Sequence, residues 1–596
     1  MPVFFRVELH KKVFIINHLQ AKKLSMNQST LVNKFFKYSY YILFLGIVSL
    51  NPILYLFDCG FHPSFFHTDL SAYIQLSKEI IDHGRLTVLS WGHVDSGLIL
   101  PPMYPLLIAI GTFFSQEVFF MAHVVTWLSA LLVIIPISFV FKEIKLPFAA
   151  LAALLCIFFN NKYFYYSIQP VTEATFMLFA VITLYIGLKL HGSDKAKPSL
   201  ALLTGMLAGM TFLCRHLGIS LIIFLLFWQI IQLALHPTEK KIFIAKGACL
   251  LTGFIAIFLP YSIILFHQTG QIYITQHYRQ DKYAVYESDD KVLGHKSSIL
   301  NATGSNYKDI YKSRRELRQL TPDSSEMLEY LIAYNKCCDN QKSIALIAKT
   351  AFFIKNFYFN ILHIYNQFGP VYFILFLLSC FSPIFIKLAF LSRATRAYFL
   401  CFIVIYILLL SHYTSFIARY VEVIFPIIII HLCIEFSIIT MWIKRIFKFT
   451  INNELKWKYL FFVICVIVIS LGGNRYTYQT KWFIIQDDNV FSFRKYIQKG
   501  DPVFVLKPYR AIIVDGIFRV VPNASIQKIY IYAKKTGVKW LIVDHAANEL
   551  DRREIQFYNN APWLTDKSNL EIKYPEIIKL KTVTDEGVAL YQFKEK

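Results

Sequence analysis

The feature that most limits how this chain can fold is a series of apolar runs about as long as a membrane is thick. A helix that crosses a bilayer needs about 20 mostly apolar residues, because each residue adds about 1.5 Å along the helix axis. We predict eleven spans, at 38–57, 118–141, 146–160, 170–188, 199–213, 217–235, 247–266, 370–390, 397–411, 420–441 and 458–473. The chain is therefore predicted to be an α-helical polytopic membrane protein.

Positive charges lie in short clusters between these runs. Lys and Arg number 61 against 38 Asp and Glu, a surplus that could indicate nucleic-acid binding. The clusters fall in alternate loops, however, as the positive-inside rule requires, so we predict membrane lipids and no nucleic acid as partners. The pattern places the N-terminus inside and the C-terminus outside. The charges counted as cytoplasmic include Lys142, Lys145, Lys240, Lys241, Arg393, Arg396, Lys444 and Arg445.

The boundaries between the runs divide the chain into three regions. Residues 1–37 are predicted to form a cytoplasmic tail, and 38–473 a transmembrane domain with outer loops at 58–117 and 267–350. The apolar stretch 103–115 is too short to span, and we predict a surface-lying or re-entrant helix there. Residues 474–596 are predicted to form a small α/β domain outside the membrane. Its predicted strands are 503–506, 511–514, 540–543 and 588–593, with a helix at 526–535.

Polar side chains gather at the predicted outer face. Ionisable residues at membrane depth are energetically costly, so they are functional candidates by default. Asp69 and Tyr73 are spaced by four and would share one side of a helix. The complete set of candidates is Asp69, Tyr73, His93, Asp95, Tyr104, Glu173, Arg215, His216, Arg419 and Tyr420.

Each candidate also has an interpretation without function. Asp69 could cap the helix that follows it, and Glu173 could belong to a purely structural ion pair. Arg215 and Arg419 could extend to lipid headgroups as interface anchors. Spacing alone predicts an outward-facing polar site built from several loops and helix ends, and it names no reaction.

The ordered set of motifs resembles the C-type glycosyltransferase superfamily, in particular its protein mannosyltransferase and lipid A aminoarabinose transferase branch. Asp69 with Tyr73, followed by Gly84, resembles the acidic motif of the first outer loop. Four further segments are similar to family segments, in the same order: PPMYPLLIAI, VTEATFMLFAVITLY, LTGMLAGMTFLCRHLGI and RYVEVIFPIII. The tail segment KKTGVKWLIVD resembles the family's outer domain. One departure is Leu100, where these enzymes often have His or Lys before the double proline.

The resemblance implies a transfer of sugar from a polyprenyl-phosphate donor to a lipid, glycan or protein acceptor. It implies Asp69 as the base and a single displacement with inversion at the anomeric carbon. Glu173 would position the acceptor or bind an optional divalent cation, alone or with Asp69; no cofactor is expected with certainty. Arg215 and Arg419 would bind the donor phosphate.

Two other classes remain open from the residues alone, a secondary transporter and a membrane-bound polymer ligase of cell-envelope glycans. Transporters place charges near the bilayer midplane on broken helices, whereas the charges here lie at outer helix ends and loops. We expect the protein in a bacterial inner membrane, with its active site facing the periplasm.

Overall fold

A computed structural model describes residues 68–86, 100–115, 117–144, 146–158, 163, 166–167, 169–192, 198–269, 353–366, 393–413, 418–446, 490–505, 508–514, 516–521, 525–544, 563, 569–584 and 587–594. Every described residue lies within residues 61–596, which form one compact unit. The predicted spans 38–57, 370–390 and 458–473 therefore lie outside the described residues, as does the loop from 270 to 350.

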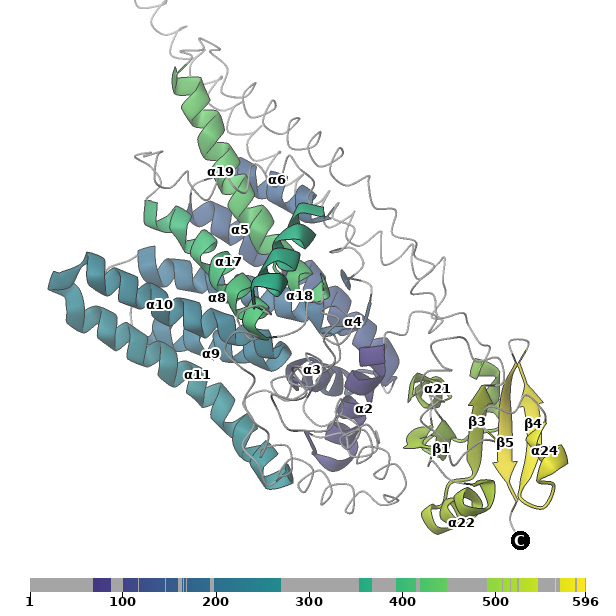
Figure 1. The fold of residues 1–596 in the computed structure, drawn as a ribbon. Coiled ribbons are helices and arrows are strands. Elements are labelled where there is room, and N and C mark those ends of the chain that lie inside the picture. The colour runs from purple at the N-terminus through teal and green to yellow at the C-terminus, as the bar shows by residue number, and fades with distance from the viewer. Residues whose placement is uncertain are drawn as a thin grey trace, which may run out of the picture. The chain divides into compact units, whose positions relative to one another are not determined.

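The larger part of the described chain is helical (Figure 1). Every predicted span within the described residues overlaps a helix. The helices are α2 (Thr68–His83), α3 (Met103–Gly111), α4 (Val118–Leu132), α5 (Ile134–Glu143), α6 (Pro147–Phe158), α8 (Thr172–Gly192), α9 (Pro198–Cys214), α10 (Ile219–Leu235), α11 (Lys240–Thr269), α17 (Arg393–Tyr413), α18 (Ala418–Glu422) and α19 (Phe425–Ile446). Residues 353–366 form a further helix.

Four helical segments among the described residues are long and apolar enough to cross a membrane. They are Val118–Glu143, Thr172–His191, His216–Leu235 and Pro237–His267. The first combines α4 and α5, which meet at a turn at Val133. Pro136 lacks the N–H that would bond to the carbonyl of Leu132, which explains the interruption. The count of eleven spans and the orientation stay predictions.

The 103–115 segment contains α3, which has nine residues. At about 1.5 Å per residue it is far too short to cross a bilayer. Tyr104 and Ile108 on this helix are fully buried against Tyr73 and Ile74 of α2 and Ala122 of α4. A short helix is thus present as predicted, with its inner face packed against protein. Its surface-lying or re-entrant placement stays a prediction.

The backbones of α9 and α11 lie in direct contact, because each helix has a glycine where the two meet. A Cβ atom added at Gly205 would lie 2.0 Å from the carbonyl oxygen of Leu250, and one added at Gly253 would lie 2.1 Å from that of Leu202. Small residues at helix contacts are typical of membrane bundles, where close van der Waals packing replaces the hydrophobic effect.

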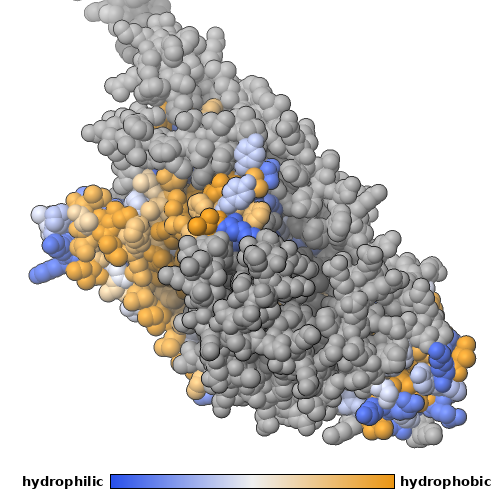
Figure 2. Space-filling model, viewed as in Figure 1, coloured by the Kyte–Doolittle hydropathy of each residue, from blue (hydrophilic) through white to orange (hydrophobic). Residues whose placement is uncertain are grey.

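The outward faces of α10 and α11 are apolar. Ile223, Phe227, Leu251, Ile255 and Leu259 are all exposed large hydrophobic side chains. Figure 2 shows these helices covered by hydrophobic surface, with hydrophilic side chains at the tip where they connect. A continuous apolar exterior with polar ends suits contact with lipid, and the chain is an integral membrane protein.

The C-terminal part contains a five-stranded sheet in the order β2-β1-β3-β5-β4. The strands are β1 (Pro502–Val505), β2 (Ile517–Val520), β3 (Trp540–Asp544), β4 (Ile578–Val583) and β5 (Val588–Phe593). β1 pairs in parallel with β2 and β3, whereas β5 pairs antiparallel with β3 and β4. Helix α22 (Ile526–Thr536) buries Ile529 and Ala533 in the core of the sheet, with Phe504 and Leu541.

One predicted strand in this region is wrong. Residues 511–513 are instead the end of the short helix α21 (Pro508–Ile513), and Val514 lies in the turn that follows. The run Ala511–Val514 is apolar and rich in β-branched residues, a pattern that does not separate a short strand from a buried turn of helix. Pro508 opens the helix, a position where its missing N–H costs nothing. The other three predicted strands and the helix are confirmed, and β2 and β4 were not predicted.

Candidate functional site

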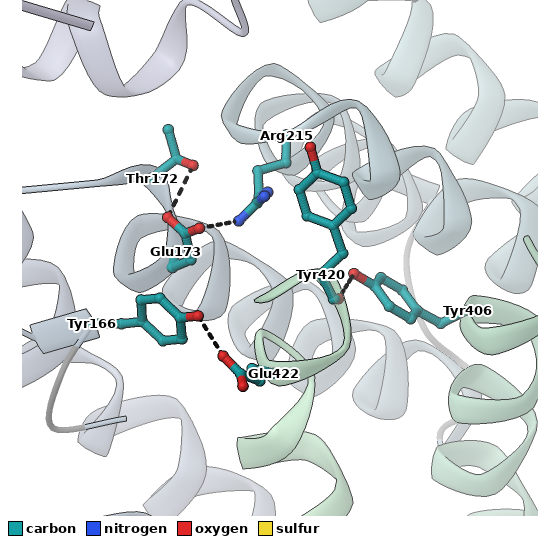
Figure 3. A network of polar contacts seen from close by, with 7 residues as sticks. All are labelled: Tyr166, Thr172, Glu173, Arg215, Tyr406, Tyr420 and Glu422. Carbon is teal, nitrogen blue, oxygen red and sulfur yellow. Dashed lines mark hydrogen bonds and ion pairs between the residues drawn. The ribbon is translucent and has the colours of Figure 1, made fainter. Parts of the chain in front are cut away.

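Glu173, Arg215 and Tyr420 meet at a buried point between three segments (Figure 3). Glu173 is the second residue of α8, and Arg215 follows the last residue of α9. Arg215 adopts an extended backbone conformation before the 3-10 turn His216–Gly218, which leads directly into α10. Tyr420 lies on α18. The tight connection between α9 and α10 thus directs Arg215 inward rather than toward solvent.

The Arg215 and Glu173 side chains form a buried ion pair. Nη1 of Arg215 lies 2.6 Å from Oε1 of Glu173, and the two side chains are 8% and 2% exposed. Oε2 of Glu173 accepts a longer contact of 3.4 Å from the Thr172 hydroxyl. Burying either charge alone would be costly, so each one requires the other. Glu173 therefore does belong to an ion pair. Its role toward the acceptor stays a prediction.

Two guanidinium groups lie against the ring of Tyr420. The Arg215 guanidinium carbon is 4.6 Å from the ring centroid and that of Arg419 is 5.4 Å from it. The Tyr420 carbonyl accepts a 2.7 Å hydrogen bond from the Tyr406 hydroxyl on α17. Cation–π contact stabilises guanidinium groups beside an aromatic face. The Tyr420 ring thereby brings together two predicted site residues, Arg215 and Arg419, that are 204 positions apart in the sequence.

Sequence reasoning missed a second carboxylate beside this group. Glu422 is 1% exposed. It accepts hydrogen bonds from the Tyr166 hydroxyl and, at 3.0 Å, from Nε2 of His363. An available signal was the acid itself, because Glu422 stands inside the apolar run of a predicted span. Its partners could not be foreseen, since they lie 256 and 59 residues away along the chain.

The predicted tyrosines of the first outer loop also lie together. The rings of Tyr73 and Tyr104 meet edge to face at 5.6 Å between centroids. The Tyr104 hydroxyl contacts the Ala122 carbonyl at 3.0 Å and the Thr126 hydroxyl at 2.9 Å. Burial raises the pKa of the Tyr104 phenol, and the charge of Glu173 makes a smaller contribution in the same direction. Tyr104 therefore stays a neutral hydroxyl within the electrostatic reach of Glu173.

The remaining predicted site residues stand apart or lie outside the described structure. Asp69 belongs to the first turn of α2, one helical turn before Tyr73, and its side chain is outside the described residues. His93 and Asp95 are also outside them. His216 is buried, and its ring packs on Phe212 with 5.3 Å between centroids.

Metal binding finds no support among the residues that the structure describes. Within that part of the chain, no group of three or more His, Cys, Asp or Glu side chains could hold an ion. Glu173 is already paired with Arg215. A divalent cation at Asp69 and Glu173 stays an untested prediction, because the Asp69 carboxylate is not among the described side chains.

Three comparisons with known proteins bear on this arrangement. Residues 100–264 match the family model "Dolichyl-phosphate-mannose-protein mannosyltransferase". This segment includes Tyr104, Glu173 and Arg215. Comparison of the sequence with curated proteins gives no significant match.

Solved structures share the fold over nearly the whole chain. ArnT from Cupriavidus metallidurans, bound to undecaprenyl phosphate, gives a TM-score of 0.53 at 9% identity, covering 93% of this chain and 98% of that one. The archaeal oligosaccharyltransferase AglB from Archaeoglobus fulgidus, in complex with an inhibitory peptide and a dolichol-phosphate, gives 0.50 at 11% identity, covering 93% and 74%. Residues 100–264 therefore resemble the mannosyltransferase family, and the chain shares its overall fold with these two solved proteins.

Proposed function

We propose that the protein is a membrane glycosyltransferase that moves a sugar from a polyprenyl-phosphate donor to a lipid, glycan or protein acceptor. The observation that supports this most directly is the convergence of Arg215 and Arg419 on the Tyr420 ring. Two guanidinium groups held on one aromatic side chain form a fixed positive centre. Such a centre suits the phosphate of a lipid-linked donor.

The chemistry requires stabilisation of the leaving group. The bond between the anomeric carbon and the phosphate oxygen breaks, and its electron pair leaves with the lipid phosphate, which gains negative charge. Charge-assisted hydrogen bonds from arginine stabilise that charge. Glu173 orients Arg215 by pairing with Nη1. The other N–H groups of the guanidinium fork can then face the phosphate, since arginine has five donors.

The other half of the reaction needs a base. The acceptor hydroxyl loses its proton as its oxygen bonds to the anomeric carbon, and we propose that the Asp69 carboxylate takes that proton. Asp69 lies one helical turn from Tyr73, whose ring packs on Tyr104. A single displacement of this kind inverts the anomeric carbon. His93, Asp95 and His216 remain proposed substrate-binding residues, and acceptor contact by Glu173 also stays a proposal.

The donor's apolar tail requires access from lipid. We place the active site at the outer face of a bacterial inner membrane, open to the periplasm, on the basis of the positive-inside charge pattern. We also propose that the transferred sugar is a hexose or a pentose. A donor of this kind presents its phosphate at the membrane interface. We propose that this phosphate binds where the ends of α8 and α9 bring Glu173 and Arg215 together.

Purified protein incubated with radiolabelled polyprenyl-phosphate sugar tests the proposal. We expect transfer to an added envelope extract, or slow hydrolysis of the donor without it. The Arg215→Ala/Arg419→Ala double variant should abolish both. Movement of the intact donor across the membrane of proteoliposomes, without cleavage of its sugar–phosphate bond, would indicate a transporter instead. Joining of preformed glycan polymers, with no use of the monosaccharide donor, would indicate a ligase.

A further inference from the structure

Helix α18 is too short to hold its own conformation, although it includes both Arg419 and Tyr420. It covers five residues, Ala418–Glu422. Isolated helices shorter than about 12 residues are marginal in stability, because few hydrogen bonds offset the cost of nucleation. The turn 423–424, which joins α18 to α19, and contacts with other segments must therefore set the conformation of α18. The position of the proposed phosphate-binding residues depends on those contacts.

Glu422 makes the contacts at the end of α18. Its carboxylate is buried and accepts hydrogen bonds from Tyr166 and from Nε2 of His363. A buried carboxylate is costly unless donors satisfy its oxygens. Since a carboxylate can only accept, both donors are needed, and they determine where Glu422 can lie. Figure 3 shows Glu422 and Tyr166 directly beside the Glu173–Arg215 pair.

The helix 353–366 presents a polar face to this region. Asn356, Asn360 and His363 are spaced by four and three residues, so they share one face. The Asn360 amide donates to the Ser411 hydroxyl at 3.0 Å, and the Asn356 amide donates to the Ser411 carbonyl at 3.4 Å. Ser411 lies near the end of α17, just before α18. The same helix face therefore holds the chain on both sides of Arg419 and Tyr420.

We propose that His363 is a positioning residue for the donor site. By donating to Glu422, with Asn356 and Asn360 on the same face bonded to Ser411, it fixes α18 so that Arg419 and Tyr420 face the donor phosphate. This inference rests on the proposed function. It predicts that loss of the His363 hydrogen bond weakens donor binding more than it slows the chemical step, because His363 acts on the site through Glu422 and α18.

Two substitutions at His363 test the proposal. His363→Leu removes the donor group, whereas His363→Gln keeps an amide that can donate to Glu422. Donor KM is measured from initial rates of transfer or hydrolysis, and binding of sugar-free polyprenyl phosphate is measured by native mass spectrometry. We expect His363→Leu to raise donor KM and the dissociation constant about tenfold, the loss of one hydrogen bond to a charged group. His363→Gln should stay within about threefold of the parent, since it restores that bond.

The control is Tyr358→Leu on the opposite face of the same helix, where Tyr358 is 61% exposed. It should leave both quantities unchanged. Should His363→Leu fail to insert, Glu422→Gln takes its place, and a raised donor KM is again expected. Unchanged donor KM and lipid-phosphate binding in folded His363→Leu would overturn the inference, as would a Gln variant as defective as Leu. A parent protein that neither binds nor cleaves the donor would instead refute the proposed function itself.

Discussion

Glu173→Gln should destabilise the protein far more than an ordinary substitution of a carboxylate. The change keeps the size of the side chain, so it opens no cavity. It removes the negative charge 2.6 Å from Arg215, whose side chain is only 8% exposed. Breaking a buried ion pair by removing one partner costs about 3–5 kcal/mol, because the remaining charge stays buried without compensation.

Buried thiols provide the assay. Cys156, Cys214 and Cys433 are free and buried, so a thiol-reactive dye reports their exposure as detergent-solubilised protein is heated. The matched control is Glu143→Gln at the end of α5, where the side chain is exposed; it should change stability by less than about 0.5 kcal/mol. We expect a clearly lower unfolding midpoint for Glu173→Gln and little change for the control.

A double variant separates the ion pair from other effects. Glu173→Gln combined with Arg215→Met removes both charges, so it should recover much of the stability lost in the single variant. The reasoning would be refuted by equal midpoints for Glu173→Gln and Glu143→Gln. It would also be refuted by strictly additive losses in the double variant, because residues in one buried pair must couple.

Three further predictions concern chemistry and packing. Arg215→Lys and Arg419→Lys should each lower kcat/KM for the donor roughly ten- to a hundredfold, since lysine lacks the planar fork; unchanged values at limiting donor would show that the two arginines do not bind the donor phosphate. Asp69→Asn should lower turnover by about 10²–10⁴ in folded protein, because the amide cannot accept the proton; near-normal turnover would move the base to another residue. Gly205→Leu should cost about 1–3 kcal/mol or more by forcing α9 from α11. Gly247→Leu, where an added Cβ meets nothing within 4 Å, should be tolerated, and the dye assay compares the two.

Hydropathy predicted the helical framework because lipid imposes one requirement on every span. Each of the segments 118–141, 170–188, 217–235 and 247–266 corresponds to a long apolar helical segment. The ends of the helices were less predictable. Helix α11 begins at Lys240, seven residues before the predicted start of its span at 247. Lysine at a helix end can extend its charge to the headgroup region, so hydropathy underestimates helix length there.

In the C-terminal part of the chain, sequence periodicity also indicates a strand that was not predicted. Strand β4 has the sequence IKLKTV, in which apolar and charged residues alternate over its first four positions. That alternation is typical of a strand with one exposed face, as an edge strand at the end of the β2-β1-β3-β5-β4 order has. Residues 511–514 had no such alternation. Their helical conformation depends on tertiary packing, which a short apolar run does not specify.

The candidate site was predicted as a set of residue types but not as a set of pairs. Glu173, Arg215, Arg419 and Tyr420 were each selected as polar residues at membrane depth. That Arg215 contacts both Glu173 and Tyr420 depends on how α8, α9 and α18 pack. Helix packing in a bundle is set by side-chain shapes on several helices at once, and no local pattern encodes it.

The pair of Arg396 and Glu435 shows how charge counting can mislead and what would correct it. Arg396 was counted as a cytoplasmic loop charge, yet it is fully buried and bonds to Glu435 through Nε at 3.0 Å and Nη2 at 2.7 Å. The distinguishing signal is an acid inside another predicted span, as Glu435 is within 420–441. The same signal applies to Arg215, with Glu173 in the span 170–188. A guanidinium in such a pair can still bind substrate, because the carboxylate occupies at most two of its five N–H groups. It is instead held in a fixed orientation, and a fixed donor stabilises charge on a leaving phosphate without reorganising as the bond breaks.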